Sequence, residues 1–317
     1  MHRYKIPLIG ILLLITLSSC KDCVEGTLPL EEIKVSATPI PSTVTLEPTA
    51  TLPPTPTFTP TVTPIVILDP DPIEIEIITV DGTVLQGIYY PAEANPAPLI
   101  VLFHWARGDL EEWGELALWL QNRDQLNRKP DYNHSWKSSN WYPENLREEP
   151  LGVLIFTLRE CTGGCQNYLP IEWLQDIESA VKAALELQGV NKDQILTAGA
   201  SIGADGAIYA CVYLNDNNSG HCLGSFSLSP ASLLTIPYED LAGQLINNEP
   251  PIPVYCLYGL RDDASVETCT NLPGITLVDY GYIENHGMEL LQPNQNPDPL
   301  VLLQEFIQIS LTGKIEK

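Results

Sequence analysis

Gly199-Ala200-Ser201-Ile202-Gly203 lies between an apolar run, residues 195–198, and a run compatible with a helix, residues 204–213. This order predicts a sharp strand-to-helix turn that presents the Ser201 hydroxyl as a nucleophile. Such a turn forces the serine into strained backbone geometry, and the two glycines let the strand and the helix approach closely. A glycine-rich turn before a buried helix would show the same pattern, so the surrounding elements decide between the two interpretations.

Strand and helix patterns alternate on both sides of this turn. Residues 73–80 and 83–90 flank Asp81-Gly82, which predicts a hairpin with a tight turn. Continuous apolar runs and apolar residues at helical spacing predict further strands at residues 99–103, 153–158, 195–198, 224–229, 254–258 and 275–280, and helices at residues 111–121, 172–187, 204–213, 238–246 and 299–310. A hairpin followed by such alternation predicts an α/β fold with a mostly parallel eight-stranded sheet and helices on both faces.

Two further motifs follow the serine in the chain. Gly259-Leu260-Arg261-Asp262 comes just past the second strand after the serine turn, and His286 comes in the loop after the last strand. In this order of nucleophile, acid and histidine the chain resembles the α/β-hydrolase family over residues 73–312, and within it the dienelactone-hydrolase-type esterases. The resemblance implies an α/β-hydrolase fold in which Ser201, Asp262 and His286 are catalytic.

Each of the three side chains has a distinct expected role. A serine hydroxyl is a poor nucleophile at neutral pH and needs a base, which the resemblance assigns to His286. Among the 5 histidines of the chain, His104 is the competitor for this role, because it ends the strand at residues 99–103. Asp262 would orient His286 and stabilise its imidazolium form. The adjacent Asp263 takes this role if the turn shifts by one residue, and solvated turn carboxylates are the alternative without function.

Backbone N–H groups should receive the oxyanion of the transition state. Ile202 is the first expected donor, since it follows the nucleophile at a helix start. The resembled family commonly takes the second donor from a His-Gly-x loop, and by position that donor is Ala106. Trp105 replaces the usual glycine, and its indole either lines the acyl pocket or packs over the sheet edge. His104 and Trp105 are therefore the candidate pocket residues, and in the family such a histidine usually supports the oxyanion loop.

Two connections bear on access to the site. Residues 230–253 have room for one short helix and no large cap, so we expect an open cleft without a lid. Residues 122–150 join a helix to a strand, and such a connection is expected at the opposite end of the sheet. Its aromatic residues, expected to form a packed flap or a partner surface, are Tyr132, Trp136, Trp141 and Tyr142. Asp205 is interpreted as a favourable charge at a helix N-terminus.

The N-terminal region has the features of a targeting segment. A basic start is followed by the apolar residues 6–17, a run shorter than the about 20 residues that span a bilayer. Leu17-Ser18-Ser19-Cys20 resembles the bacterial lipoprotein box, which implies cleavage just before Cys20, removal of residues 1–19 and acylation of Cys20. An ordinary secretory signal with a chance cysteine is the alternative. We expect residues 20–64 to be a lipidated N-terminus and a Thr/Pro-rich linker that cannot form a core, and residues 65–317 to form the hydrolase domain.

Cysteine content and net charge limit the cellular compartment and the binding partners that fit this chain. The chain has 8 cysteines, which outside the cytoplasm pair by default. Local spacing favours three disulfides, Cys161–Cys165, Cys211–Cys222 and Cys256–Cys269, and leaves Cys23 unpaired beside the anchor. The sequence does not fix this connectivity. For Cys161 and Cys165, a metal site is the rival interpretation. The formal charge of -24 argues against binding to nucleic acid and against charge-driven binding to anionic lipid.

The leading hypothesis is a membrane-tethered extracytoplasmic serine hydrolase that cleaves small-molecule carboxylic esters through an acyl-enzyme. A serine peptidase or a thioesterase would use the same three side chains, because a fold does not choose among these reactions. A non-catalytic binding lipoprotein on a hydrolase scaffold is the alternative from another class, and the altered His104-Trp105 loop favours it. We expect no cofactor and no metal ion.

Overall fold

The computed structural model describes residues 71–123, 131, 133–147, 149–217, 219–270 and 272–314. The predicted signal peptide, Cys20, Cys23, the Thr/Pro-rich linker and Tyr132 lie outside these residues. Within the described part of the chain, no helix is long and apolar enough to cross a membrane.

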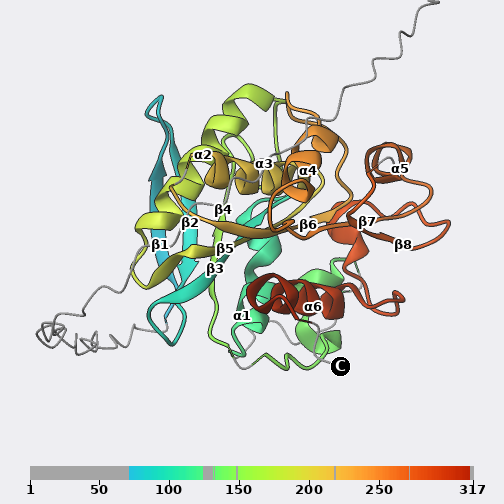
Figure 1. Cartoon of the computed structure of the whole chain (residues 1–317), viewed down its shortest axis with the longest axis horizontal. Coiled ribbons are helices and arrows are strands. Elements are labelled where there is room, and N and C mark those ends of the chain that lie inside the picture. The colour runs from blue at the N-terminus through green and yellow to red at the C-terminus, as the bar shows by residue number, and fades with distance from the viewer. Residues whose placement is uncertain are drawn as a thin grey trace, which may run out of the picture. The chain divides into compact units, whose positions relative to one another are not determined.

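A single eight-stranded sheet forms the centre of the described domain (Figure 1). Its spatial order is β1-β2-β4-β3-β5-β6-β7-β8. The strands are β1 (Ile73–Ile78), β2 (Val84–Tyr90), β3 (Ala97–Phe103), β4 (Gly152–Phe156), β5 (Val190–Ala200), β6 (Cys222–Leu228), β7 (Val254–Tyr258) and β8 (Thr276–Asp279). Strand β2 is antiparallel to β1 and β4, and all later neighbours pair in parallel. The predicted fold class is therefore confirmed.

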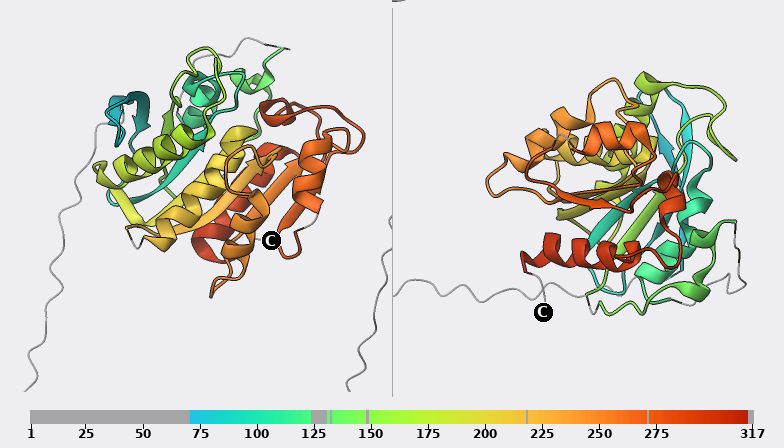
Figure 2. Two further views of the ribbon diagram at one scale, coloured as in Figure 1. Left: turned by 90° about the horizontal axis from the view of Figure 1, so that it is seen from above. Right: turned by 90° about the vertical axis from the view of Figure 1, so that its right-hand side faces the viewer.

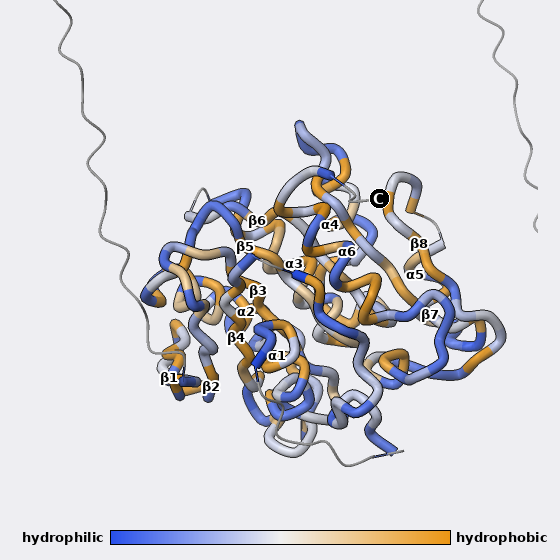
Figure 3. The backbone as a smooth tube through the Cα atoms, turned by 90° about the horizontal axis from the view of Figure 1, so that it is seen from below, coloured by the Kyte–Doolittle hydropathy of each residue, from blue (hydrophilic) through white to orange (hydrophobic). Residues whose placement is uncertain are grey.

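Helices cover both faces of the sheet, as the two views of Figure 2 show. One face carries α2 (Pro170–Glu186), α3 (Ile202–Asp216) and α4 (Tyr238–Ile246), and the other carries α1 (Gly114–Leu120) and α6 (Pro299–Thr312). Each set packs its apolar residues into a separate core, one on each side of the strands. Every residue of β4 is buried, which explains its continuous apolar sequence. Hydrophobic residues run along the central strands, whereas the connecting loops are mostly hydrophilic (Figure 3).

Two features of the fold were not predicted. Helix α5 (Asp263–Thr270) follows β7, although its β-branched residues and low apolar content gave no helical pattern. The connection between α1 and β4 contains two short 3-10 helices, η2 (Ser135–Lys137) and η3 (Ser139–Trp141). Between β6 and β7 the one helix is α4, so the expected absence of a large cap agrees with the fold.

All three disulfides form with the pairing that the spacing predicted. They join Cys161 to Cys165, Cys211 to Cys222 and Cys256 to Cys269. The first pair is thus a disulfide and does not supply metal ligands. Among the described residues, no group of three or more His, Cys, Asp or Glu side chains could hold a metal ion.

Candidate active site

Ser201 occupies the turn between β5 and α3 in a strained backbone conformation. Its φ of 54° and ψ of -123° lie in a region that residues with a Cβ rarely adopt. The Ser201 N–H donates to the Leu228 carbonyl at the end of β6 (2.8 Å), which fixes the turn to the neighbouring strand. The residue is 5% exposed. The predicted strand-turn-helix context of the pentapeptide is therefore present.

The two glycines of the pentapeptide are required by close backbone approach. A Cβ on Gly199 would lie 2.0 Å from the Gly203 carbonyl oxygen. A Cβ on Gly203 would lie 2.3 Å from the Phe103 oxygen and 2.4 Å from the His104 oxygen. Backbone atoms at such distances cannot yield without moving the strand, so glycine at these positions lets β5, α3 and the end of β3 meet.

Gly203→Ala is expected to destabilise the fold by about 3 kcal/mol or more, because it overpacks a site closed by backbone. Gly243→Ala in α4 is the matched control, since nothing lies within 4 Å of its Cβ. The control should be neutral or stabilising by up to about 1 kcal/mol. Urea unfolding monitored by circular dichroism measures both. Equal unfolding midpoints for the two variants would contradict this account of the turn.

His286 bridges the serine and an acid. Its Nε2 lies 2.7 Å from Ser201 Oγ, and its Nδ1 lies 2.7 Å from Asp262 Oδ2. The residues come from three loops, after β5, after β7 and after β8, which lie at one edge of the sheet because these strands are parallel. A hydroxyl, an imidazole and a carboxylate in this order can activate the hydroxyl as a nucleophile.

Asp262, not the adjacent Asp263, is the acid that contacts His286. Asp263 is exposed in the first turn of α5. Asp262 Oδ2 also accepts a hydrogen bond from the buried Ser265 Oγ (2.6 Å). Burial disfavours the ionised form of Asp262, but the hydrogen bonds from His286 and Ser265 outweigh it and lower the pKa of the carboxyl. The carboxylate is therefore ionised when it faces the imidazole.

Glu289 holds the histidine loop in place and was not identified from the sequence. Its Oε2 accepts the His286 N–H (3.2 Å), and its Oε1 pairs with Arg107 Nη1 (3.1 Å). Arg107 in turn lies over the Trp105 ring, 5.5 Å from its centroid. Glu289 thus links the loop that carries His286 to the loop after β3. A glutamate three residues after the histidine at the start of a short helix was the available signal.

His104 supports the loop after β3 rather than facing substrate. It is 1% exposed, and its Nε2 accepts the Leu158 N–H (3.0 Å). That acceptor role places the proton on Nδ1, which donates to the Trp105 carbonyl (2.7 Å). Burial lowers the pKa of His104, so the ring is neutral. Both nitrogens are occupied by backbone, which leaves His286 as the histidine in contact with the nucleophile.

The two expected oxyanion donors lie on loops that meet at Ser201. Ile202 begins α3, and the first N–H groups of a helix have no partner within the helix. Among the described residues, no hydrogen bond uses the Ala106 N–H. Gly287 packs between the loop after β3 and the nucleophile, since a Cβ on Gly287 would lie 3.1 Å from the Trp105 ring and 3.5 Å from Ser201 Cβ. Trp105 therefore lies near the nucleophile, with Gly287 between the two side chains.

Trp136 corrects the expected position of the connection between α1 and β4. Its ring packs edge-on against Trp105 with centroids 5.5 Å apart, and its indole N–H donates to the buried Glu112 (2.6 Å). Ser135 Oγ donates to the Leu291 carbonyl, just after the histidine loop (3.0 Å). The chain thus returns from the far end of the sheet to the nucleophile before it enters β4. The expectation failed because this excursion of the loop is fixed by contacts distant in sequence.

Asp205 lies in the first turn of α3, as expected, and also has contacts that the sequence did not predict. Its buried carboxylate accepts N–H groups from Ala231 (3.2 Å), Ser232 (3.3 Å) and Leu233 (2.6 Å). These bonds fasten the loop after β6 to the helix that begins behind the nucleophile. Burial raises the pKa of Asp205 from 3.8 to about 7, while the three N–H groups favour the ionised form and oppose that shift. Asp205 therefore holds a neighbouring loop in addition to lying at the N-terminus of α3.

The raised pKa of Asp205 predicts a pH dependence of stability. Between about pH 4 and pH 7 the folded state binds a proton that the unfolded state has released, so the free energy of unfolding falls as the pH rises. The loss is about 1.4 kcal/mol per pH unit in this window. Asp205→Asn removes this titration, so wild type should lose stability relative to the variant as the pH rises. Urea unfolding of both proteins across this range is the measurement, and parallel curves would refute the assignment.

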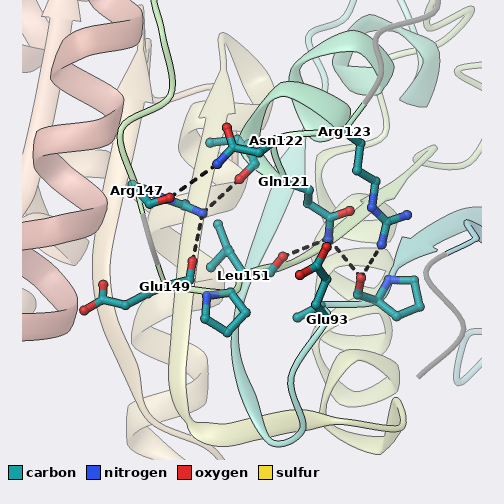
Figure 4. Close-up of a pocket in the computed structure, with 11 residues that line it drawn as sticks. Glu93, Gln121, Asn122, Arg123, Arg147, Glu149 and Leu151 are labelled. Carbon is teal, nitrogen blue, oxygen red and sulfur yellow. Dashed lines mark hydrogen bonds between the residues drawn. The ribbon is translucent and has the colours of Figure 1, made fainter. Parts of the chain in front are cut away.

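A separate pocket lies at the opposite end of the sheet, where β2 ends and β4 begins (Figure 4). Gln121 Nε2 donates to the carbonyls of Tyr90 (2.8 Å) and Leu151 (2.8 Å), and Arg147 Nη2 donates to that of Leu120 (2.8 Å). Burial lowers the pKa of Arg147 to about 10. These side chains join loops through backbone carbonyls, so we regard them as structural and not as part of the candidate site.

Comparison with solved structures places this arrangement on a known fold. An esterase of Pyrococcus furiosus matches at a TM-score of 0.51 with 14% identity, covering 75% of this chain and 90% of the esterase. An esterase of the archaeon Pyrobaculum calidifontis matches at a TM-score of 0.51 with 13% identity, covering 78% of this chain and 87% of the esterase. No model of a known protein family and no curated protein sequence matches the chain. The chain therefore has the α/β-hydrolase fold.

Proposed function

We propose that this protein is a serine hydrolase that cleaves carboxylic esters of small molecules through an acyl-enzyme. The observation that carries the proposal is the chain of two 2.7 Å contacts from Ser201 Oγ through His286 to Asp262. The strained turn at Ser201 and its position before a helix support it, because both are expected of a nucleophile presented on this fold.

The geometry suggests how each group acts. Ser201 Oγ attacks the ester carbonyl while His286 Nε2 takes its proton, and Asp262 stabilises the resulting imidazolium. The N–H groups of Ile202 and Ala106 receive the oxyanion. Collapse of the tetrahedral intermediate breaks the ester C–O bond, and His286 gives its proton to the departing alkoxide. Water, deprotonated by His286, then attacks the acyl carbonyl; the bond between Ser201 Oγ and the acyl carbon breaks, the acid leaves, and His286 returns the proton to Oγ.

An ester is the substrate that we favour. The two solved structures described above are both esterases by name. A peptidase and a thioesterase would use the same side chains, and a non-catalytic binding protein would not use them. A panel of p-nitrophenyl esters of increasing acyl length, compared with an aryl amide and a thioester, separates these activities.

A fluorophosphonate probe tests the proposed nucleophile. Wild-type protein should be labelled covalently, and Ser201→Ala should lose both labelling and ester hydrolysis while remaining folded. Ser227→Ala is a matched control, because this buried serine lies on β6 and its Oγ accepts a hydrogen bond from the Tyr238 hydroxyl (2.9 Å) rather than contacting His286. Folded wild-type protein that resists the probe would rule out this function.

We further propose that the protein is extracytoplasmic and anchored to a bacterial membrane by acylation of Cys20. The basic start, the short apolar run and the sequence before Cys20 support this location. The three disulfides of the domain agree with an oxidising compartment. The acidic net charge of -24 does not favour attachment to anionic lipid by charge, so a lipid anchor is the better account of binding.

Metabolic labelling with a palmitate analogue should modify the wild-type chain and leave Cys20→Ala unlabelled. Cys23→Ala is the matched control, because it removes a cysteine three positions away and should keep the label. Labelling that survives Cys20→Ala, or an unlabelled wild type in the membrane fraction, would contradict the anchor. The readout is in-gel fluorescence after fractionation.

A further inference from the structure

The disulfide-closed loop at residues 161–165 packs against the loop that carries the expected second oxyanion donor. Cys165 N–H donates to the Ala106 carbonyl (2.8 Å), and Gly163 N–H donates to Asp109 Oδ2 (2.7 Å). Gly164 lies so close that a Cβ on it would be 3.4 Å from the Arg107 backbone. These contacts join two loops that follow adjacent parallel strands, β3 and β4.

The peptide groups on both sides of Ala106 are held by their carbonyls. His104 Nδ1 donates to the Trp105 carbonyl (2.7 Å), and Cys165 N–H donates to the Ala106 carbonyl (2.8 Å). In a trans peptide the C=O and the N–H point in opposite directions. Holding the Trp105 carbonyl therefore fixes the direction of the Ala106 N–H, and holding the Ala106 carbonyl fixes its position. Both supports leave that N–H without a partner among the described residues.

Residues 158–165 contribute to the support of both peptide groups, and the Trp105 carbonyl also accepts the Gly108 N–H within its own loop (3.3 Å). Leu158 N–H donates to His104 Nε2 (3.0 Å), which sets the tautomer that holds Trp105. Cys161 N–H donates to the Leu158 carbonyl (3.2 Å), and Gly164 N–H donates to the Cys161 carbonyl (2.8 Å). Gly163 and Gly164, with φ of 67° and 111°, add little stiffness of their own to this loop, so the covalent bond between Cys161 and Cys165 closes it together with the backbone hydrogen bond from Gln166 N–H to the Glu160 carbonyl (2.9 Å).

We propose that the Cys161–Cys165 disulfide positions the Ala106 N–H as the second oxyanion donor, with Cys165 as the positioning residue. This inference rests on the proposed function. Without the bond, the loop at residues 161–165 can open, the Cys165 N–H leaves the Ala106 carbonyl, and the donor is no longer held at a fixed distance from the oxyanion. Preorganised donors lose much of their effect when they must reorganise during the reaction.

Comparison with the Cys211–Cys222 disulfide shows that only the Cys161–Cys165 bond of these two lies beside the loop after β3. Cys211 and Cys222 join α3 to the start of β6, at the end of the sheet opposite Ser201, and both are fully buried. That pair supports the fold without touching the loop after β3. Cys165, in contrast, is half-buried and hydrogen-bonds that loop directly. Cys211→Ala/Cys222→Ala is therefore the matched control for Cys161→Ala/Cys165→Ala.

The test compares these two double variants of the full chain with wild type, using p-nitrophenyl acetate as substrate and a boronic acid as a mimic of the tetrahedral intermediate. Cys161→Ala/Cys165→Ala should lower kcat by about 10- to 100-fold, because a displacement of about 1 Å can cost as much as 100-fold. Its KM and the shape of its pH profile should stay close to wild type, since the contacts of His286 and Asp262 are retained. Boronate affinity should fall together with kcat.

The control variant should keep kcat within about twofold of wild type at temperatures where it is folded. Hydrogen exchange adds a readout that does not need activity, and peptides covering residues 104–109 should lose protection only in Cys161→Ala/Cys165→Ala. An active wild type whose Cys161→Ala/Cys165→Ala variant keeps full kcat and boronate affinity overturns the positioning role alone. A wild type that neither hydrolyses esters nor reacts with the phosphonate overturns the proposed function instead.

Discussion

His286→Ala is expected to lower kcat for ester hydrolysis by about a million-fold. His286 Nε2 lies 2.7 Å from Ser201 Oγ, so it is placed to take the hydroxyl proton. Removing the base of such a unit disables the nucleophile as fully as removing the nucleophile itself, and the activity that remains comes from binding and the oxyanion donors. The measurement is steady-state hydrolysis of p-nitrophenyl acetate, with stopped-flow detection of any acyl-enzyme burst.

His221→Ala is the control for this prediction, because His221 is exposed and lies before β6, at the other end of the sheet. It should hydrolyse the ester at the wild-type rate. Exogenous imidazole offers a second check. A small base that enters the vacated space should restore part of the activity of His286→Ala and should not raise the activity of His221→Ala. A His286→Ala variant that keeps more than about a hundredth of wild-type kcat would show that another group is the base.

The sequence predicts the order and type of the strands because each carries a local pattern. Strand β4 reads as one apolar run, and β1 and β2 flank a recognisable tight turn. Ser201, Asp262 and His286 also stand next to local signals, a glycine pattern or the end of a strand. Because parallel strands bring their ends to one edge, the order of the strands predicts that these three side chains lie at the same edge of the sheet, and the family resemblance predicts that they meet there.

Residues that support the site could not be predicted in this way. Asp205 and Cys165 act through hydrogen bonds to backbone groups of other loops, and Glu289 reaches another loop through the Arg107 side chain; no periodic pattern marks such contacts. Trp136 reaches Trp105 because the loop before β4 returns to the nucleophile, a path determined by tertiary packing. Helix α5 was missed because tertiary contacts outweigh its weak helical propensity. In each case the local sequence is compatible with several positions, and packing against distant segments chooses one.

The two adjacent aspartates show most clearly what the sequence leaves open and the structure decides. The glycine spacing favours Asp262 over Asp263 and leaves both possible. In the structure Asp262 Oδ2 lies 2.7 Å from His286 Nδ1, while Asp263 is exposed at the start of α5. Asp262→Asn is therefore expected to lower kcat by about ten-thousand-fold, because an amide nitrogen facing the ring favours the tautomer whose Nε2 carries a proton and cannot accept one from Ser201.

Asp263→Asn makes the same chemical change one residue away and should alter kcat by less than about twofold, since a solvated surface carboxylate contributes little. The comparison excludes a general effect of charge, because both variants lose one negative charge from the same turn. Ser265→Ala adds an intermediate case. It removes the 2.6 Å hydrogen bond to Asp262 Oδ2 but keeps the carboxylate, so its loss of kcat should lie between the other two. Similar losses in Asp262→Asn and Asp263→Asn would contradict the geometry, because only one of these carboxylates contacts His286.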